Sequence, residues 1–167
     1  KRMEFYYEPY HQAVSALIDQ CLAIGTSPML LSIHSFTESW KQLTRPWHVG
    51  VLWDADARLA KPLLDSFFAE GDLIVGENEP YAGQLEGDCL WQHGTQRGLA
   101  NAIIEIRQDL IRDEAGQAAW AGRLCRIMDK LLRDRNQVPK LGAPEAPGGH
   151  ASKLQGTTEA PTHGGRD

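Results

Sequence analysis

The stretch Met29-Leu30-Leu31-Ser32-Ile33-His34-Ser35-Phe36-Thr37 decides the fold. It begins as an apolar run of the length of a strand and stops abruptly at polar side chains. We therefore predict a buried strand over 29–33 with His34 at the rim of a sheet, where open α/β sheets bind their ligands. The alternative is a histidine that only forms a hydrogen bond at a strand end.

Three further apolar segments have the length of strands. They are 47–53, the short segment 73–75, and 102–107. Segments with helical periodicity lie between them. This alternation predicts the fold class α/β, with a mostly parallel or mixed sheet between helices.

Apolar side chains recur at helical spacing in three segments. The first helix follows Pro9, which suits a first turn, and Gly25 and Pro28 close it. Asp113 and Glu114 are predicted to cap the beginning of the longest helix. The three apolar stripes are Val14, Leu17, Ile18, Cys21 and Leu22; then Leu59, Leu63, Leu64, Phe67 and Phe68; then Trp120, Leu124, Ile127, Met128 and Leu131.

The second of these helices carries two local signals. Either Asp54 or Asp56 can cap its beginning, and Pro62 should kink it or split off its first turn. The segments 36–46 and 84–92 have no clear period and are predicted to be loops, while 93–99 reads as a loop or a short helix.

The composition limits the classes of function. The chain has 167 residues with 17 basic and 22 acidic side chains, a formal charge of −5, which argues against nucleic acid and against a polybasic membrane surface as partners. No segment approaches the roughly 20 apolar residues of a membrane span. The three cysteines are widely spaced and suggest neither a disulfide framework nor a CxxC metal site, which favours the cytoplasm.

The chain divides into two parts by composition. Residues 1–137 have the apolar content of one folded domain. Residues 138–167 are rich in Pro, Gly and Thr and contain almost no large apolar residue, so we predict a disordered tail.

The segment 102–107 places Glu105 and Arg107 in an otherwise apolar strand. Residues two apart on a strand share a face, and a charge in such a run is costly unless it is paired or used. The two side chains are therefore either each other's partners or part of a site.

The predicted ends of the strands gather the residue types of a polar pocket. These include a possible metal ligand, a carboxylate that could activate water, and guanidinium groups that could bind a carboxylate. The pattern leaves open which of them are used. The residues are His34, Ser35, Thr37, Arg45, Asn78, Glu79, His93, Glu105 and Arg107.

Four blocks, in this order, resemble the N-formylglutamate amidohydrolase family. They are 32–37 (SIHSFT), 45–53 (RPWHVGVLW), 76–81 (GENEPY), and 93–94 (HG) with 104–111 (IEIRQDLI). The resemblance covers the chain from about Tyr7 to Leu132. It implies a fold like that of zinc exopeptidases, of the phosphorylase/hydrolase-like type, with the metal at the strand ends.

The resemblance also implies a function and roles for residues. The function is zinc-dependent hydrolysis of N-formyl-L-glutamate, or of a similar N-acyl amino acid, to formate and the amino acid, as in bacterial histidine breakdown. His34 would be a zinc ligand, and Glu105 the carboxylate that activates the water on the metal. The candidates for substrate binding are Arg45, Asn78, Arg107, Tyr81 and His93.

One part of the family pattern is missing from the sequence. Further metal ligands, a Glu and a His close together, are expected in a segment before Lys1, so we expect the chain to be truncated at its N-terminus. Without them, His34 would need His48 or His93 as partners. The alternative function is a metal-free, non-catalytic domain of the same fold that binds a small acid or a protein. The sequence indicates no oligomeric state.

Overall fold

The computed structural model describes residues 1–83 and 86–134, and the predicted tail 138–167 lies outside this part. The helical elements are η1 (Met3–Tyr7), α1 (Glu8–Ala23), α2 (Ala60–Glu70), α3 (Cys89–His93), η2 (Thr95–Arg97), η3 (Gln108–Ile111) and α4 (Glu114–Arg133). The strands are β1 (Leu30–Phe36), β2 (Ser39–Trp40), β3 (Leu43–Thr44), β4 (Val49–Leu52), β5 (Val75–Glu77) and β6 (Asn101–Arg107).

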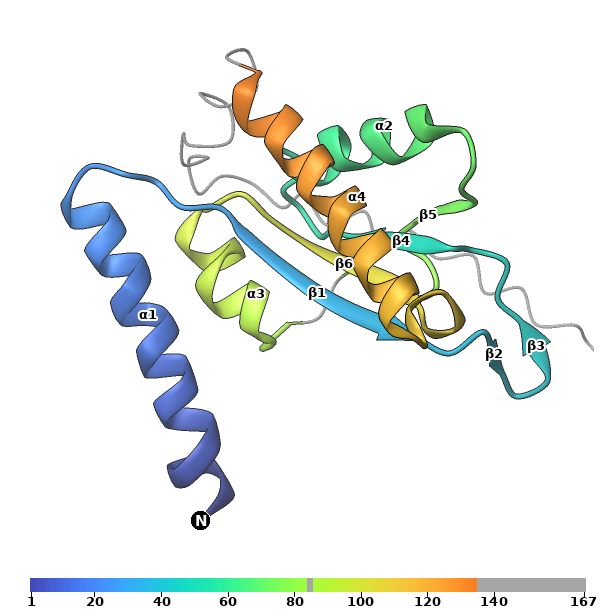
Figure 1. Ribbon diagram of the computed structural model, residues 1–167. Coiled ribbons are helices and arrows are strands. Elements are labelled where there is room, and N and C mark those ends of the chain that lie inside the picture. Colours follow the sequence, from blue (N-terminus) through green and yellow to red (C-terminus); the bar gives the residue numbers. More distant parts are fainter. Residues whose placement is uncertain (84–85, 135–167) are drawn as a thin grey trace, which may run out of the picture.

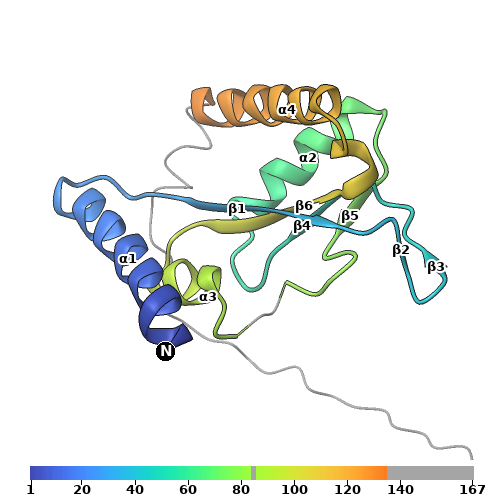
Figure 2. The same cartoon turned by 60° about the horizontal axis from the view of Figure 1, so that its bottom comes forward.

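A mixed sheet of four strands forms the centre of the fold, in the order β1-β6-β4-β5 (Figure 1). β1 runs parallel to β6 and β4 runs parallel to β5, whereas β4 and β6 are antiparallel. Helices α2 and α4 cover one face of the sheet, and α1 and α3 lie on the other side (Figure 2). The predicted fold class, an α/β fold with a mixed sheet between helices, is confirmed.

The main core lies between the sheet and helices α2 and α4. Side chains alternate along β6, so that Ala102, Ile104 and Ile106 enter this core together with Leu63, Phe67, Trp120, Ile127 and Leu131 of the two helices. Ile103, Glu105 and Arg107 therefore point to the face on the side of α3. A smaller apolar cluster on that face contains Leu52, Leu90 and Ile103.

The prediction of a buried strand at 29–33 is wrong in two respects. Among the described residues β1 is an edge strand, and its residues before Phe36 are at most partly buried, with Ile33 57% exposed. It also extends to Phe36, the most buried of its side chains, so that His34 lies within the strand and not beyond its end. An apolar run alone cannot distinguish an edge strand from a central one.

The first and last helices differ in how well their stripes are buried. The α4 stripe lies on the core, and Asp113 caps the helix by accepting a hydrogen bond from the Gly116 amide, as predicted. Along α1 only Ile18 is buried, and Leu17 is 63% exposed. The interpretation of the whole α1 stripe as a core face is therefore wrong within the described residues.

The beginning of α2 also departs from the predictions. The residue at its N-cap is Leu59, and no side chain caps it. The Asp56 carboxylate instead accepts hydrogen bonds from the backbone and the guanidinium of Arg58. Pro62 lies in the first turn of the helix, where a missing N–H costs little.

Two segments predicted as loops contain regular structure. The segment 36–46 includes the hairpin β2–β3, and 84–92 includes the start of α3. Asp88 caps α3 by accepting a hydrogen bond from the Trp91 amide. None of the helices in the described residues combines the length and apolar character of a membrane span.

Two glycines allow a loop to lie close against the face of the sheet that carries Glu105. Gly50 stands opposite Glu105 in the β4–β6 register and beside Gly76 of β5. A Cβ atom on Gly50 would lie 1.9 Å from the carbonyl oxygen of Glu79. The backbone at 79–80 thus occupies the space that a side chain on Gly50 would fill.

We expect Gly50→Ala to destabilise the protein by about 1 to 3 kcal/mol, because the backbone of Glu79 must shift to admit a methyl group. Gly122→Ala is the matched control, since Gly122 lies in α4 and an added Cβ meets only the flexible end of Arg126 at 3.6 Å. It should stabilise by up to about 1 kcal/mol through helix propensity. Chemical denaturation measures both free energies of unfolding, and equal shifts would contradict the packing argument.

Candidate active site

The register of the parallel pair β1–β6 sets His34 beside Glu105. Both side chains point to the face of the sheet on the side of α3, and the distance from His34 Nδ1 to Glu105 Oε1 is 3.7 Å. The imidazole is 54% exposed, whereas the carboxylate is 8% exposed. His34 Nε2 lies 3.2 Å from the Ser32 hydroxyl. A buried acid thus lies against an imidazole that solvent can reach.

The surroundings of Glu105 make its carboxylate more basic than usual. Burial raises the pKa of its carboxyl above the usual value, and the positive charges of His34 and Arg45 partly oppose this shift. Its Oε2 atom is buried and has no hydrogen-bond partner within the described residues. Such an oxygen normally pairs with a donor, so an acceptor is available here for a proton or a bound group.

Arg45 contributes positive charge to the same region. Its Nη1 donates to the Tyr81 hydroxyl at 3.0 Å and to the Thr37 hydroxyl at 3.2 Å. The guanidinium also lies 5.0 Å from the centre of the Tyr81 ring and 5.9 Å from those of Phe36 and Trp40. Since all its hydrogen bonds in the described part of the chain come from Nη1, its other N–H groups remain for a carboxylate.

Arg107 is not the partner of Glu105. Its Nε and Nη2 donate to the Asp109 carboxylate at 2.7 and 3.1 Å, and this ion pair lowers the pKa of Asp109. Its Nη1 donates to the carbonyl oxygens of Arg45, Pro46 and Trp47. The interpretation of Glu105 and Arg107 as each other's partners is therefore wrong. Arg107 holds the segment that carries Arg45.

Asn78 connects two strands. Its side-chain oxygen accepts a hydrogen bond from the backbone N–H of Trp53 at 2.9 Å. Its backbone N–H donates to the carbonyl oxygen of Val51. With φ at +52° it adopts the left-handed conformation that asparagine tolerates. These bonds fix the chain that leads to Tyr81.

His93 and His48 do not join His34. His93 is buried on α3, and its Nε2 lies 2.7 Å from His11 Nδ1 of α1. His48 Nδ1 accepts a hydrogen bond from the Ile74 amide. The substrate-binding roles of Arg45, Asn78, Arg107, Tyr81 and His93 stay predictions, as do the roles of His34 and Glu105.

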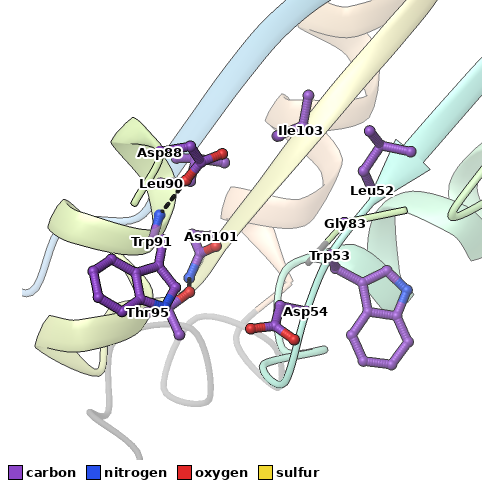
Figure 3. A pocket seen from close by; sticks show the side chains of 10 residues that line it. All are labelled: Leu52, Trp53, Asp54, Gly83, Asp88, Leu90, Trp91, Thr95, Asn101 and Ile103. Carbon is purple, nitrogen blue, oxygen red and sulfur yellow. Dashed lines mark hydrogen bonds between the residues drawn. The ribbon is translucent and has the colours of Figure 1, made fainter. Parts of the chain in front are cut away.

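A small pocket lies on the same face of the sheet, between α3 and the ends of β4 and β6 (Figure 3). Asp54 lies between the rings of Trp53 and Trp91, and the side chains of Asn101 and Thr95 form a hydrogen bond at 3.4 Å. The pocket continues the surface that carries Glu105, because Asn101, Ile103 and Glu105 are each two residues apart on β6 and therefore share one face of the sheet.

The residue types beside Glu105 fit a zinc site in part. The His34 imidazole lies near Glu105 Oε1, while Glu105 Oε2 has no hydrogen-bond partner among the described residues, and an imidazole beside such a carboxylate is a suitable pair. Zinc requires three or four protein ligands, and in the part of the chain that the structure describes His34 belongs to no group of three potential ligands. Such a group exists elsewhere and comprises His11, Cys89 and His93.

Sequence reasoning missed two of these features. The hairpin residue Trp40, which lies against Arg45, carries no signal in a segment without a period. The group of His11, Cys89 and His93 had one signal, since Asp88 is a typical N-cap and would begin a helix that places Cys89 and His93 on one face. The contact with His11 spans 82 positions and has no local signature.

Comparison with protein-family models identifies one family for this chain. The model of N-formylglutamate amidohydrolase matches residues 1–112. The crystal structure of gene product Atu2144 from Agrobacterium tumefaciens superposes with a TM-score of 0.71 at 40% identity. The match covers 78% of this chain and 52% of that chain, so this chain spans about half the length of its structural relative. No curated protein matches the sequence.

We expect Arg107→Lys to lower the free energy of unfolding by about 1 to 3 kcal/mol, because an ammonium cannot bind Asp109 with two N–H groups and also reach the carbonyls of 45–47. Arg133→Lys is the control, since Arg133 forms an exposed pair with Asp129 and should change stability by less than about 0.5 kcal/mol. Denaturant titration compares the two variants, and a neutral Arg107→Lys would contradict the anchoring role.

Proposed function

The chain belongs to the N-formylglutamate amidohydrolase family, and on this premise we propose that its His34–Glu105 pair forms part of the active site of a zinc-dependent amidohydrolase. The substrate would be N-formyl-L-glutamate or a similar N-acyl amino acid, and the products formate or another acid and the free amino acid. The observation that carries the proposal is the buried carboxylate of Glu105, which lies 3.7 Å from the exposed imidazole of His34.

Hydrolysis requires a proton to move from water to the leaving amine. The water oxygen bonds to the formyl carbon, the carbon–nitrogen bond breaks, and the nitrogen gains a proton. Glu105 suits this transfer because burial raises the pKa of its carboxyl, which makes the carboxylate a better base. Its Oε2 has no partner within the described residues and can accept the proton.

His34 would supply one of the zinc ligands. A zinc ion held there would supply Lewis-acid polarisation of the amide carbonyl and of water. The imidazole is exposed on the side where substrate must arrive and is in contact with Glu105. The carboxylate can orient and stabilise a ligating imidazole through this contact.

Arg45 is the best candidate for binding a substrate carboxylate. It is partly buried among Phe36, Trp40 and Tyr81, which fix its guanidinium and lower its exposure to water. The Tyr81 hydroxyl accepts one of its hydrogen bonds, and Arg107 and Asn78 hold the segments on either side. This arrangement fits an acidic substrate of small size.

The proposal also includes the fold type of the protein, the cellular compartment in which it acts and its partner. A mixed sheet with helices on both faces supports a fold like that of zinc exopeptidases. The three cysteines are free, which supports the reducing cytoplasm as the site of action. A small N-acyl amino acid is the partner that we propose.

We expect Glu105→Gln to lower turnover of N-formyl-L-glutamate by about 10² to 10⁴-fold, because the amide keeps the shape of the side chain but cannot accept a proton. Formate release by the protein that carries this chain, at its natural length and with zinc present, measures the effect. Glu114→Gln on the opposite face of the sheet is the control and should keep full turnover. Unchanged turnover in Glu105→Gln would refute the assigned role.

Glu105→Gln should not lower the free energy of unfolding, in contrast to its effect on turnover. Because the pKa of Glu105 is raised by folding, its contribution is fully present below the unfolded pKa and is lost as the pH rises through the folded pKa. In metal-free protein at neutral pH, we therefore expect Glu105→Gln to be at least as stable as the wild type, and its relative stability to increase from acid to neutral pH. Denaturation over this pH range tests the sign, and a less stable Glu105→Gln at neutral pH would contradict it.

A further inference from the structure

Three potential metal ligands meet where α1 passes α3. They are His11 of α1 and Cys89 and His93 of α3. His11 Nδ1 lies 2.7 Å from His93 Nε2, and the ligand atoms of all three side chains lie within 4.8 Å of one another. This group includes neither His34 nor Glu105, and the substrate-binding role predicted for His93 is a separate proposal.

Local structure holds the three side chains in place. Cys89 and His93 are four residues apart and share one side of α3, whose start is fixed by the Asp88 cap. The His11 ring lies 4.1 Å from the Tyr7 ring and is stacked on His93 at 5.0 Å with an interplanar angle of 21°. The hydroxyl of Tyr10 lies 3.5 Å from Cys89 Sγ.

Burial and the neighbouring groups favour the neutral form of His93. Burial lowers the pKa of His93, and the electrostatic influence of His11 and of Arg97 lowers it further. A neutral imidazole has a lone pair that can bind a metal. The simpler explanation of the contact between His11 and His93 is a hydrogen bond. It does not account for the Cys89 thiol, which lies within 4.8 Å of both facing nitrogens.

We propose that His11, Cys89 and His93 form a binding site for a divalent cation of the zinc type, which links α1 to α3. Two imidazoles and one thiolate are a ligand set of intermediate softness, which suits Zn²⁺ and excludes Mg²⁺ and Ca²⁺. Three protein ligands leave the fourth tetrahedral position to water.

The protons balance in this binding step. Cys89 loses its thiol proton to solvent as the sulfur–metal bond forms. The imidazole proton between His11 and His93 moves to the far nitrogen of its own ring, and both facing nitrogens then bind the ion. Zinc–nitrogen distances of about 2.0–2.1 Å and a zinc–sulfur distance of about 2.3 Å require only small side-chain movements from a cluster of this size.

The consequence is a cross-link between distant parts of the sequence. α1 buries only Ile18 of its apolar stripe, so its packing on the sheet is weak. Its other polar links to this region, among the described residues, are the contact of Tyr10 with Cys89 and those of Arg97 with Ser15 and Asp19. A bound cation would fix α1 against α3. It would thereby also hold α3, a helix of five residues, in place beside the Asn101 end of β6.

Cobalt(II) titration of the metal-free full chain tests the site, because a thiolate-to-cobalt charge-transfer band in the near ultraviolet reports a bound cysteine. We expect this band in the wild type, its loss on addition of Zn²⁺, and its absence in Cys89→Ser. Cys125→Ser and Cys21→Ser are the matched controls and should keep it. The further ligands predicted for a metal at His34 are a Glu and a His, so a metal bound there would give no such band.

Two further variants separate metal binding from folding. His11→Asn and His93→Gln keep a hydrogen-bonding group at the position of the ligand nitrogen, and each should weaken cobalt binding at least about tenfold. Circular dichroism checks that the partly exposed His11 variant is folded. No band in the wild type, or a band that survives Cys89→Ser, would overturn the site, whereas formate release tests the amidohydrolase proposal separately.

Discussion

The parallel pairing of β1 with β6 is the constraint on which the candidate active site depends. Because the two strands run in the same direction, His34 and Glu105 occupy equivalent positions and project to the same face. A shift of the register by one residue would turn His34 toward α4 and leave Glu105 without its neighbour. The apolar residues that alternate with Glu105, above all Ile104 and Ile106, fix this register by entering the main core.

The burial of Glu105 is a property of the backbone around it. Gly50 and Gly76 have no side chains to fill the adjacent surface of the sheet, and the chain at 79–80 fills it instead. Asn78 fixes the start of this chain by its bond to the Trp53 amide. This burial raises the pKa of Glu105.

Much of the fold could be predicted from local sequence. The apolar run of β6, the stripe of α4 and the Asp113 cap each involve residues close in the chain. Strand order depends on pairing between distant segments, so the edge position of β1 and the exposure of the α1 stripe could not be read locally. The partner of Arg107 was ambiguous for a similar reason, since Glu105 and Asp109 are both two residues away and only the turn of η3 selects Asp109.

The two clusters of polar residues on this side of the sheet have a common physical basis. In each, a group that ionises or binds a metal is buried by the fold: Glu105 beside His34, and His93 beside His11 and Cys89. Burial of such groups costs free energy, and a cation bound at either place would offset this cost by stabilising the carboxylate, or the thiolate and the imidazole lone pairs. Buried groups of this kind, on the face of the sheet opposite the main apolar core, are more typical of a functional site than of packing.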